Sequence, residues 1–327
     1  MRVVTFGELL LRLNPPGYNR FLQTDTFFVA YTGAEANVAV ALSLLGTGAE
    51  FVTRLPENDI GSSAVNSIRR FGVRTEHIAR GGERMGIMFL EKGASQRGGN
   101  VIYDRKHTAI AEASQSDFDW EEIFKGADWF HFTGITPALS EGLAEICLTA
   151  CQKAKAAGVK ISCDLNYRAK LWSKEEAGRT LEKMMPYIDV CISNVPQLFD
   201  VFGIVGANEK EVAEKTLERF PMELLALTTR KSLSASDNVI SGALYTRETA
   251  AFSREYAVRI VDRVGGGDAF AGGLIHSLLK GAGLQKAVDF AVATSALKHS
   301  IEGDFCLVSE AEVEGLVQGD GSGRLRR

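Results

Sequence analysis

DWFHFTG at 128–134, VKISCDLN at 159–166, DVCISN at 189–194 and LLALTT at 224–229 are the stretches that decide the fold. Each is a short run of apolar and β-branched residues, which is typical of a buried strand. Helical spacing of apolar residues follows the first two runs, over about 140–157 and again after Ser173. Strands that alternate with helices predict an α/β fold with a mostly parallel sheet flanked by helices.

The alternation continues toward the N-terminus but fails in two regions. VVTFGE at 3–8 predicts another strand, and a helical pattern begins near Asn37. The regions at roughly 12–32 and 85–110 instead hold short β-prone runs separated by glycine and polar residues. We expect them to form a small antiparallel β-sheet lid. The last third is helical, so residues 1–318 are predicted as one domain, followed by a flexible tail at 319–327.

The composition is that of an ordinary globular chain. The chain has 327 residues, a formal net charge of −4 and 24% charged residues, which gives no global attraction to nucleic acid or to an anionic membrane. No apolar run approaches the length of a membrane span, so a cytoplasmic protein without nucleic-acid or membrane partners is expected. The five cysteines form no CxxC pair and are predicted to be buried thiols.

The segment DRVGGGDAFAGG, residues 262–273, predicts an anion site. Consecutive glycines allow backbone N–H groups to converge on one point, and the start of a helix adds partial positive charge there. Asp268 at the mouth of this cradle could accept a proton from an attacking hydroxyl, although a glycine-rich turn with an aspartate N-cap is the simpler alternative. The sequence has no Gly-Lys pair of a Walker A loop and no complete GxGxxG fingerprint.

A second segment, TGAEANVAVALSLLG at 32–46, predicts a close approach between backbone and ligand. Gly33 and Ala34 form the turn, and Asn37 follows as either a helix N-cap or a ligand contact. Taken alone, neither segment shows whether its polar residue caps a helix or contacts a ligand.

Together, the two segments resemble the paired signatures of the PfkB, or ribokinase-like, carbohydrate kinases. The resemblance covers essentially the whole chain and implies a ribokinase-like fold whose lid closes over a sugar. It also implies ATP as phosphate donor with Mg²⁺, Asp268 as catalytic base, and an anion hole at Gly265, Gly266 and Gly267. In this family a monovalent cation such as K⁺ often binds nearby, which makes Asp262 a candidate ligand.

The residues around the acceptor favour a sugar acid. Tyr103 and Arg105 end a lid strand, and Arg168 follows the strand at 159–166, where parallel sheets form ligand crevices. Guanidinium groups bind carboxylates in a bidentate fashion, although a surface cation is the commoner role of any one arginine. The segments YDR at 103–105, FTGITPALS at 132–140 and DLNYRAKLW at 164–172 resemble those of 2-keto-3-deoxygluconate kinases. That resemblance implies a substrate site at Gly33, Tyr103, Arg105, Ile135 and Arg168. It adds Arg12, which stands where ribokinases and fructokinases commonly carry an aspartate.

On the nucleotide side, the resemblance points to Asn194, Thr228 and Arg230. The family's Asn-x-x-Glu motif, which helps to organise Mg²⁺, ends here in Gln197. The expected activity is transfer of the γ-phosphate of ATP to an alcohol group, namely the terminal hydroxyl of 2-keto-3-deoxy-D-gluconate. A kinase for a neutral sugar such as fructose or ribose, or a catalytically weak sugar-binding regulator on the same fold, remains an alternative. A homo-oligomer, dimeric through the lid, is common among relatives.

Overall fold

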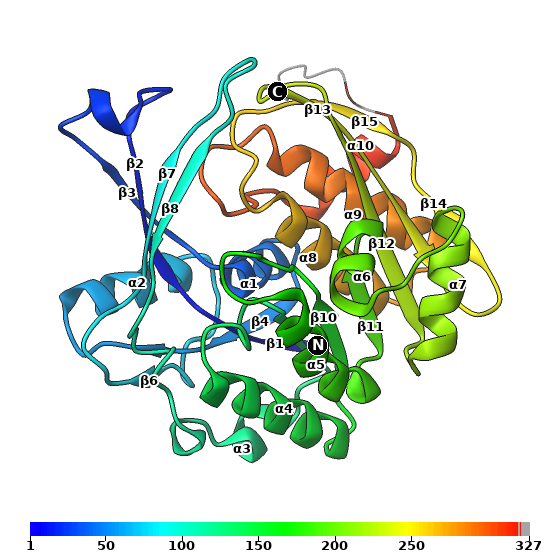
Figure 1. The fold of residues 1–327 in the computed structure, drawn as a ribbon, viewed down its shortest axis with the longest axis horizontal. Helices are drawn as coiled ribbons and strands as arrows, with labels where there is room; N and C mark the ends of the chain where they lie inside the picture. The colour runs from blue at the N-terminus through cyan, green and yellow to red at the C-terminus, as the bar shows by residue number, and fades with distance from the viewer. Residues whose placement is uncertain (320, 322–327) are drawn as a thin grey trace.

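The computed structural model describes residues 1–319 and 321, and a large sheet forms its centre (Figure 1). The strand order is β14-β13-β12-β11-β10-β9-β1-β4, and β15 pairs with β13. From β12 to β4 the neighbouring strands are parallel, whereas β13, β14 and β15 pair in antiparallel fashion. The strands are β1 (Arg2–Phe6), β4 (Gly48–Val52), β9 (Trp129–Thr133), β10 (Lys160–Asp164), β11 (Val190–Ser193), β12 (Leu224–Ser232), β13 (Asp237–Tyr245), β14 (Ala250–Phe252) and β15 (Tyr256–Arg259). The predicted α/β class is confirmed.

Successive residues of the parallel strands face two separate hydrophobic cores. Trp129 belongs to one core, whereas Phe130 and Phe132 belong to the other. The same alternation places Leu225 and Ala226 of β12 on opposite faces. A sheet that is apolar on both faces must be covered on both, which is the environment of parallel strands in α/β proteins.

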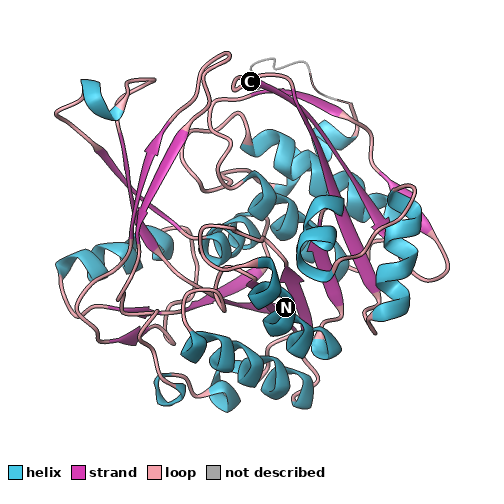
Figure 2. Ribbon diagram, viewed as in Figure 1, coloured by secondary structure: helices cyan, strands magenta, loops and turns pink. Residues whose placement is uncertain are grey.

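Helices cover both faces of this sheet (Figure 2). The core that contains Phe130 is closed by α3 (Trp120–Phe124), α4 (Glu141–Ala156), α5 (Lys174–Met184), α6 (Val195–Phe202) and α7 (Glu209–Arg219). The core that contains Trp129 is closed by α1 (Ala34–Leu44), α2 (Asp59–Arg69), α8 (Gly266–Leu279) and α9 (Leu284–Lys298), and α10 (Glu310–Val317) packs outside α9. Helix α8 lies close to both of its neighbours. A Cβ on Gly272 would come within 2.9 Å of Ala41, and one on Gly273 within 2.7 Å of Thr294.

A small separate sheet has the strand order β3-β2-β7-β8. Its strands are β2 (Leu10–Asn14), β3 (Phe28–Thr32), β7 (Ile87–Glu91) and β8 (Asn100–Asp104), and a two-stranded pair joins β5 (Arg54–Leu55) to β6 (Ala79–Arg80). The prediction of a purely antiparallel lid was wrong, because β2 and β7 pair in parallel. The chain passes through α1, β4 and α2 between them, so β7 enters the sheet in the same direction as β2.

Three further sequence-based expectations concern the tail, membrane spans and the cysteines. Most of the predicted flexible tail, at 320 and 322–327, lies outside the described residues. Within the described residues, no helix combines the length and the apolar character needed to cross a bilayer. All five cysteines are free and buried, as predicted.

Candidate functional site

A cavity of about 560 Å³ lies where the parallel strands of the large sheet end and the small sheet begins. Residues from the carboxyl ends of the strands line one side of it, including Ile135 after β9, Asp164 at the end of β10 and Asn194 after β11. Met88 and Tyr103 of the small sheet line the other side. Open α/β sheets bind ligands at this edge, so the cavity is the candidate site.

The glycines at the start of α8 form a cradle of backbone N–H groups. Gly265 is the N-cap and has φ +83°, a left-handed conformation that favours glycine. A Cβ there would also lie 2.1 Å from the carbonyl oxygen of Asp304. Gly267 has open space on its Cβ side, and within the described chain the N–H groups of Gly267 and Asp268 donate to no acceptor. Free N–H groups at a helix N-terminus bind anions, so this geometry fits a phosphate.

Asp268 lies in the first turn of α8, and Asn37 of α1 holds its carboxylate. Asn37 Nδ2 donates to Asp268 Oδ2 at 2.7 Å. Gly33 is the N-cap of α1, so Asn37 is not a cap and its side chain is free to face α8. The two segments singled out from the sequence therefore meet at one hydrogen bond, although 231 positions separate the two residues.

The pKa of Asp268 suits a proton acceptor. Burial raises the pKa to about 6, and the Asn37 hydrogen bond with the positive charges of Arg168 and Lys298 opposes that rise. Asp164 faces the same cavity, and burial together with the charge of Asp268 raises its pKa to about 7. Asp268 is the carboxylate of the two that the Asn37 amide orients. At neutral pH it is a carboxylate that can accept a proton from a hydroxyl group.

The predicted substrate residues Tyr103, Arg105, Ile135 and Arg168 all line this cavity. Arg105 pairs with Glu8, and its guanidinium lies 4.9 Å from the centre of the Tyr103 ring. Burial raises the pKa of Glu8, and the charge of Arg105 opposes this rise. The side chain of Arg168 is exposed, and among the described residues it has no hydrogen-bond or ion-pair partner. Arg168 is thus available to bind an anionic ligand.

The turn before α1 also lies at the cavity, which Ala34 and Asn37 line. Gly33 is needed for packing, because a Cβ would lie 2.0 Å from the carbonyl oxygen of Glu8. Glu35 follows, and its carboxylate accepts hydrogen bonds from the hydroxyl groups of Thr133 and Thr136, each at 2.7 Å. These bonds fix the end of β9 against α1.

The predicted nucleotide residues Asn194, Thr228 and Arg230 line the same cavity beside the glycine cradle. The Asn194 side chain caps α6 by accepting from the N–H of Gln197 at 2.9 Å. Gln197 lines the cavity, and its buried Oε1 atom has no hydrogen-bond partner among the described residues. This side of the cavity thus holds the Arg230 cation and, beneath the surface, an amide oxygen without a partner among the described residues.

Comparison with known proteins agrees with this geometry. Residues 1–304 match the family described as pfkB family carbohydrate kinase. The chain belongs to this family. It is 33% identical to a 2-dehydro-3-deoxygalactonokinase of Haloferax volcanii over 98% of both chains. It is 49% identical to a 2-dehydro-3-deoxygluconokinase of Thermotoga maritima, whose crystal structure matches with a TM-score of 0.96 over 98% of both chains. A fructokinase-1 of Oryza sativa is 29% identical over 97% of both chains.

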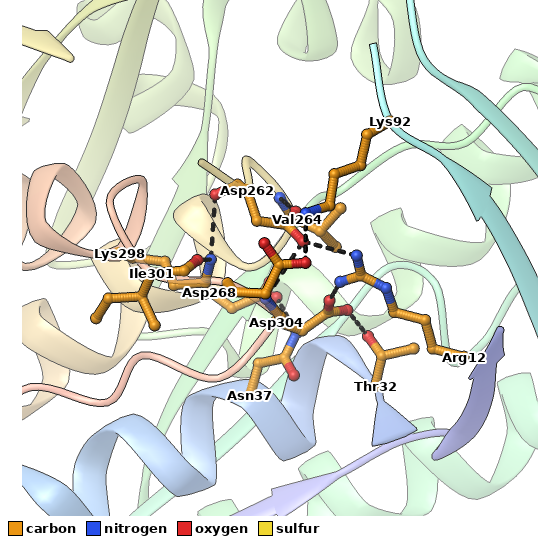
Figure 3. Close-up of polar contacts among 12 residues, drawn as sticks. Arg12, Thr32, Asn37, Lys92, Asp262, Val264, Asp268, Lys298, Ile301 and Asp304 are labelled. Carbon is orange, nitrogen blue, oxygen red and sulfur yellow. Dashed lines mark hydrogen bonds and ion pairs between the residues drawn. The ribbon is translucent and has the colours of Figure 1, made fainter. Parts of the chain in front are cut away.

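In this pfkB-family kinase, Arg12 occupies a different place from the one predicted. It lies outside the lining of the cavity and is 1% exposed. Its Nη2 atom is 2.6 Å from Asp262, and its Nη1 atom pairs with Asp304. Thr32 also donates to Asp304 (Figure 3). A guanidinium buried beside two carboxylates has its charge satisfied there, so Arg12 joins the small sheet to the cradle loop instead of facing a ligand.

The ion pair with Arg12 involves Asp262, the residue that the sequence suggested as a ligand of a monovalent cation. Its carboxylate receives Arg12, the N–H of Val264 at 3.1 Å and the N–H of Gly303 at 3.3 Å. The described residues hold no group of three or more His, Cys, Asp or Glu side chains suited to a metal. The Asp262 carboxylate, which also lines the cavity, thus already accepts from three donors of the protein.

Several cavity residues of this kinase were not predicted from the sequence. Glu8, Asp164 and Arg263 all line the cavity. Glu8 lies two residues after the end of β1, and Asp164 is the last residue of β10, so the rule that placed Arg168 at the sheet edge applies to them too. Arg263 lies in the glycine-rich segment at 262–273, and a single arginine in a loop is more often a surface cation than a cavity residue.

Proposed function

We propose that this kinase transfers the γ-phosphate of ATP to the terminal hydroxyl of 2-keto-3-deoxygluconate, also called 2-dehydro-3-deoxygluconate. The observation that carries the proposal is an unpaired arginine, Arg168, in the same cavity as Asp268 and the N–H cradle. The named activities of the Haloferax and Thermotoga relatives support an acid of this class. A carboxylate at Arg168 and Arg105 leaves the far hydroxyl to approach Asp268.

The proposed phosphoryl transfer uses the deprotonated carboxylate of Asp268 and the free N–H groups at the start of α8. Asp268 accepts the hydroxyl proton while the sugar oxygen bonds to the γ-phosphorus and the bond to the β-phosphate oxygen breaks. The N–H groups of Gly267 and Asp268 stabilise negative charge on the transferred group, because preorganised donors act strongly where water is excluded. The products are the 6-phosphate ester and ADP.

Magnesium fits the donor atoms at the site. Asp164 and Gln197 both line the cavity and carry side-chain oxygen atoms, and Mg²⁺ prefers oxygen ligands and bound water. We propose that these two residues hold the hydrated ion, with Asp164 supplying the charge that Gln197 lacks. When bound, Mg²⁺ neutralises charge on the β- and γ-phosphates of ATP.

An enzyme that consumes ATP also fits the cytoplasm, where ATP is available.

The proposed function is tested by ADP release over a panel of acceptors. We expect 2-keto-3-deoxygluconate or its galactonate epimer to give the highest kcat/KM, with fructose and ribose far lower. Arg168→Ala should raise KM for the acid by about 10- to 100-fold, because a hydrogen bond to a charged group contributes about 1.5–3 kcal/mol. Its KM for ATP should change less.

Two outcomes would contradict the sugar-acid assignment. One is a preference for fructose, which the neutralised Arg105–Glu8 pair would accommodate through hydroxyl groups. The other is an Arg168→Ala variant with unchanged KM for the acid. Arg179→Ala, on α5 and away from the cavity lining, is the matched control and should behave as wild type.

We also propose a homodimer through the outer face of the small sheet. The register aligns Val29, Leu13, Phe89 and Ile102 in one row across the strands, so their side chains share one face. Val29 is 63% exposed and Ile102 is 50% exposed. Contiguous exposed apolar residues mark interaction surfaces, and a second copy would bury them.

Light scattering during size-exclusion chromatography tests this dimer. The wild type should have twice the mass of one chain, and Val29→Lys should shift it to a monomer. Leu233→Lys, at a 69% exposed position outside that row, is the control and should stay dimeric. A monomeric wild type, or a dimeric Val29→Lys variant, would contradict the proposal.

A further inference from the structure

Lys298 is a buried lysine directly behind the glycine cradle. It is the last residue of α9 and is 0% exposed. Its Nζ atom donates to the main-chain oxygens of Asp262 and Ile301, each at 3.2 Å (Figure 3). Within the described chain, no carboxylate forms an ion pair with it, because Asp262 and Asp304 both pair with Arg12. A buried ammonium held by two carbonyls is costly unless its charge is used.

The position of this ammonium links it to the cradle. A Cβ added to Gly265 would lie 3.3 Å from Lys298 Cε, so the lysine stem packs against the first glycine. Asp262 precedes the cradle, whereas Ile301 belongs to the loop after α9 that also brings the Asp304 carbonyl against Gly265. One ammonium therefore ties together the two segments that shape the anion site.

The charge balance gives the ammonium a second effect. Arg12 and Lys298 supply two positive charges, and Asp262 and Asp304 supply two negative charges, so the buried cluster is neutral only with Lys298 present. Without it, a net negative charge would lie behind a site that must receive phosphate. Coulomb interactions are strong in such a water-poor environment.

We propose that Lys298 is a positioning residue that acts as a built-in monovalent cation for the anion site. Main-chain carbonyls are the ligands with which proteins replace the water of K⁺, and here a covalently attached ammonium takes two of them. The lysine holds the cradle loop in its binding shape, and phosphate binding therefore needs no added alkali cation. This inference rests on the proposed phosphoryl transfer, but it concerns how the cradle binds ATP.

Calorimetric titration of ATP separates this inference from the proposed function, because binding needs no sugar acceptor. In tetramethylammonium buffer with Mg²⁺, wild type should bind ATP with the same Kd whether or not K⁺ is added. Lys298→Met keeps a stem of similar length and removes the charge. Its Kd for ATP should rise by about 10- to 100-fold, in line with the loss of charged hydrogen bonds. Its Kd for adenosine should change much less.

Cation rescue distinguishes this role from a merely structural one. Added K⁺ or NH₄⁺ should restore part of the ATP affinity of Lys298→Met, whereas tetramethylammonium, which is too large for the carbonyl pair, should not. Lys280→Met, at the exposed end of α8, is the matched control and should show neither loss nor rescue. Unchanged ATP affinity in Lys298→Met, or a loss that no cation repairs, would overturn the inference.

If Lys298→Met does not fold, the effect of K⁺ on the ATP Kd of the wild type tests the inference instead. An ATP Kd that improves tenfold or more with K⁺ would show that a cation must still be supplied and would overturn the inference. An ATP Kd that is indifferent to K⁺ supports it. A protein that binds ATP in this way but phosphorylates no sugar would refute the proposed function and leave the role of Lys298 intact.

Discussion

Asp268→Asn is expected to lower kcat by about 10²- to 10⁴-fold, the usual contribution of a general base, with little change in the Kd for ATP. The asparagine retains an oxygen that can accept from Asn37 Nδ2, so the packing between α1 and α8 is preserved. What is lost is the ability to take the proton from the attacking hydroxyl. Steady-state kinetics with the best acceptor, together with ATP titration, measures both effects.

The pH dependence gives this prediction a second readout. Because burial raises the pKa of Asp268 to about 6, the wild type should lose kcat/KM as the pH falls through about 6. The sign follows from the mechanism, since only the deprotonated carboxylate can act as a base. Asp200→Asn, at a surface carboxylate that pairs with Lys174, should keep normal turnover. An Asp268→Asn variant within tenfold of wild-type kcat would remove Asp268 from the chemistry.

Arg12→Leu is expected to destabilise the fold by about 3–5 kcal/mol, the usual result of removing one partner from a buried ion pair. The substitution leaves the Asp262 and Asp304 carboxylates, both nearly inaccessible to water, without their guanidinium. Equilibrium urea unfolding measures the loss as a lower midpoint. Arg259→Leu is the control, because its 3.7 Å pair with Asp237 lies at the surface and should contribute at most about 1 kcal/mol.

The same variant separates the two roles assigned to Arg12. If Arg12 acts only inside the ion-pair cluster, the folded fraction of Arg12→Leu should keep a near-normal KM for the acceptor. A stable variant with a strongly raised KM would instead restore the substrate contact that the sequence suggested. The two results exclude each other, so one preparation decides between them.

The sequence predicted the fold because its main signals are local. The run at 128–134 places large apolar side chains on both faces of β9, as Trp129 and Phe130 show, and only a sheet covered by helices buries both. The cradle was also predictable, since three adjacent glycines before an aspartate restrict what the backbone can do. The pairing of β2 with β7 was not, because it joins strands from distant parts of the chain whose local patterns do not encode direction.

The charged residues of the site were predicted less well, for a related reason. A sequence shows that an arginine is present but not which carboxylate lies next to it. Arg12 lies 250 positions from Asp262, and Arg105 lies 97 positions from Glu8. The place of Lys298 could not be predicted, because its partners are main-chain carbonyls, which every residue carries. Arg168 was predicted at the cavity because the end of a parallel strand determines its place.

The most direct test of the proposed activity is phosphorus NMR of the product formed from ATP and 2-keto-3-deoxygluconate. Transfer to the terminal hydroxyl predicts a phosphate ester whose signal is split into a triplet by the two protons of the terminal CH₂ group, together with one equivalent of ADP. A doublet would place the phosphate on a secondary hydroxyl. Inorganic phosphate alone would mean hydrolysis of ATP, and either result would contradict the proposed reaction.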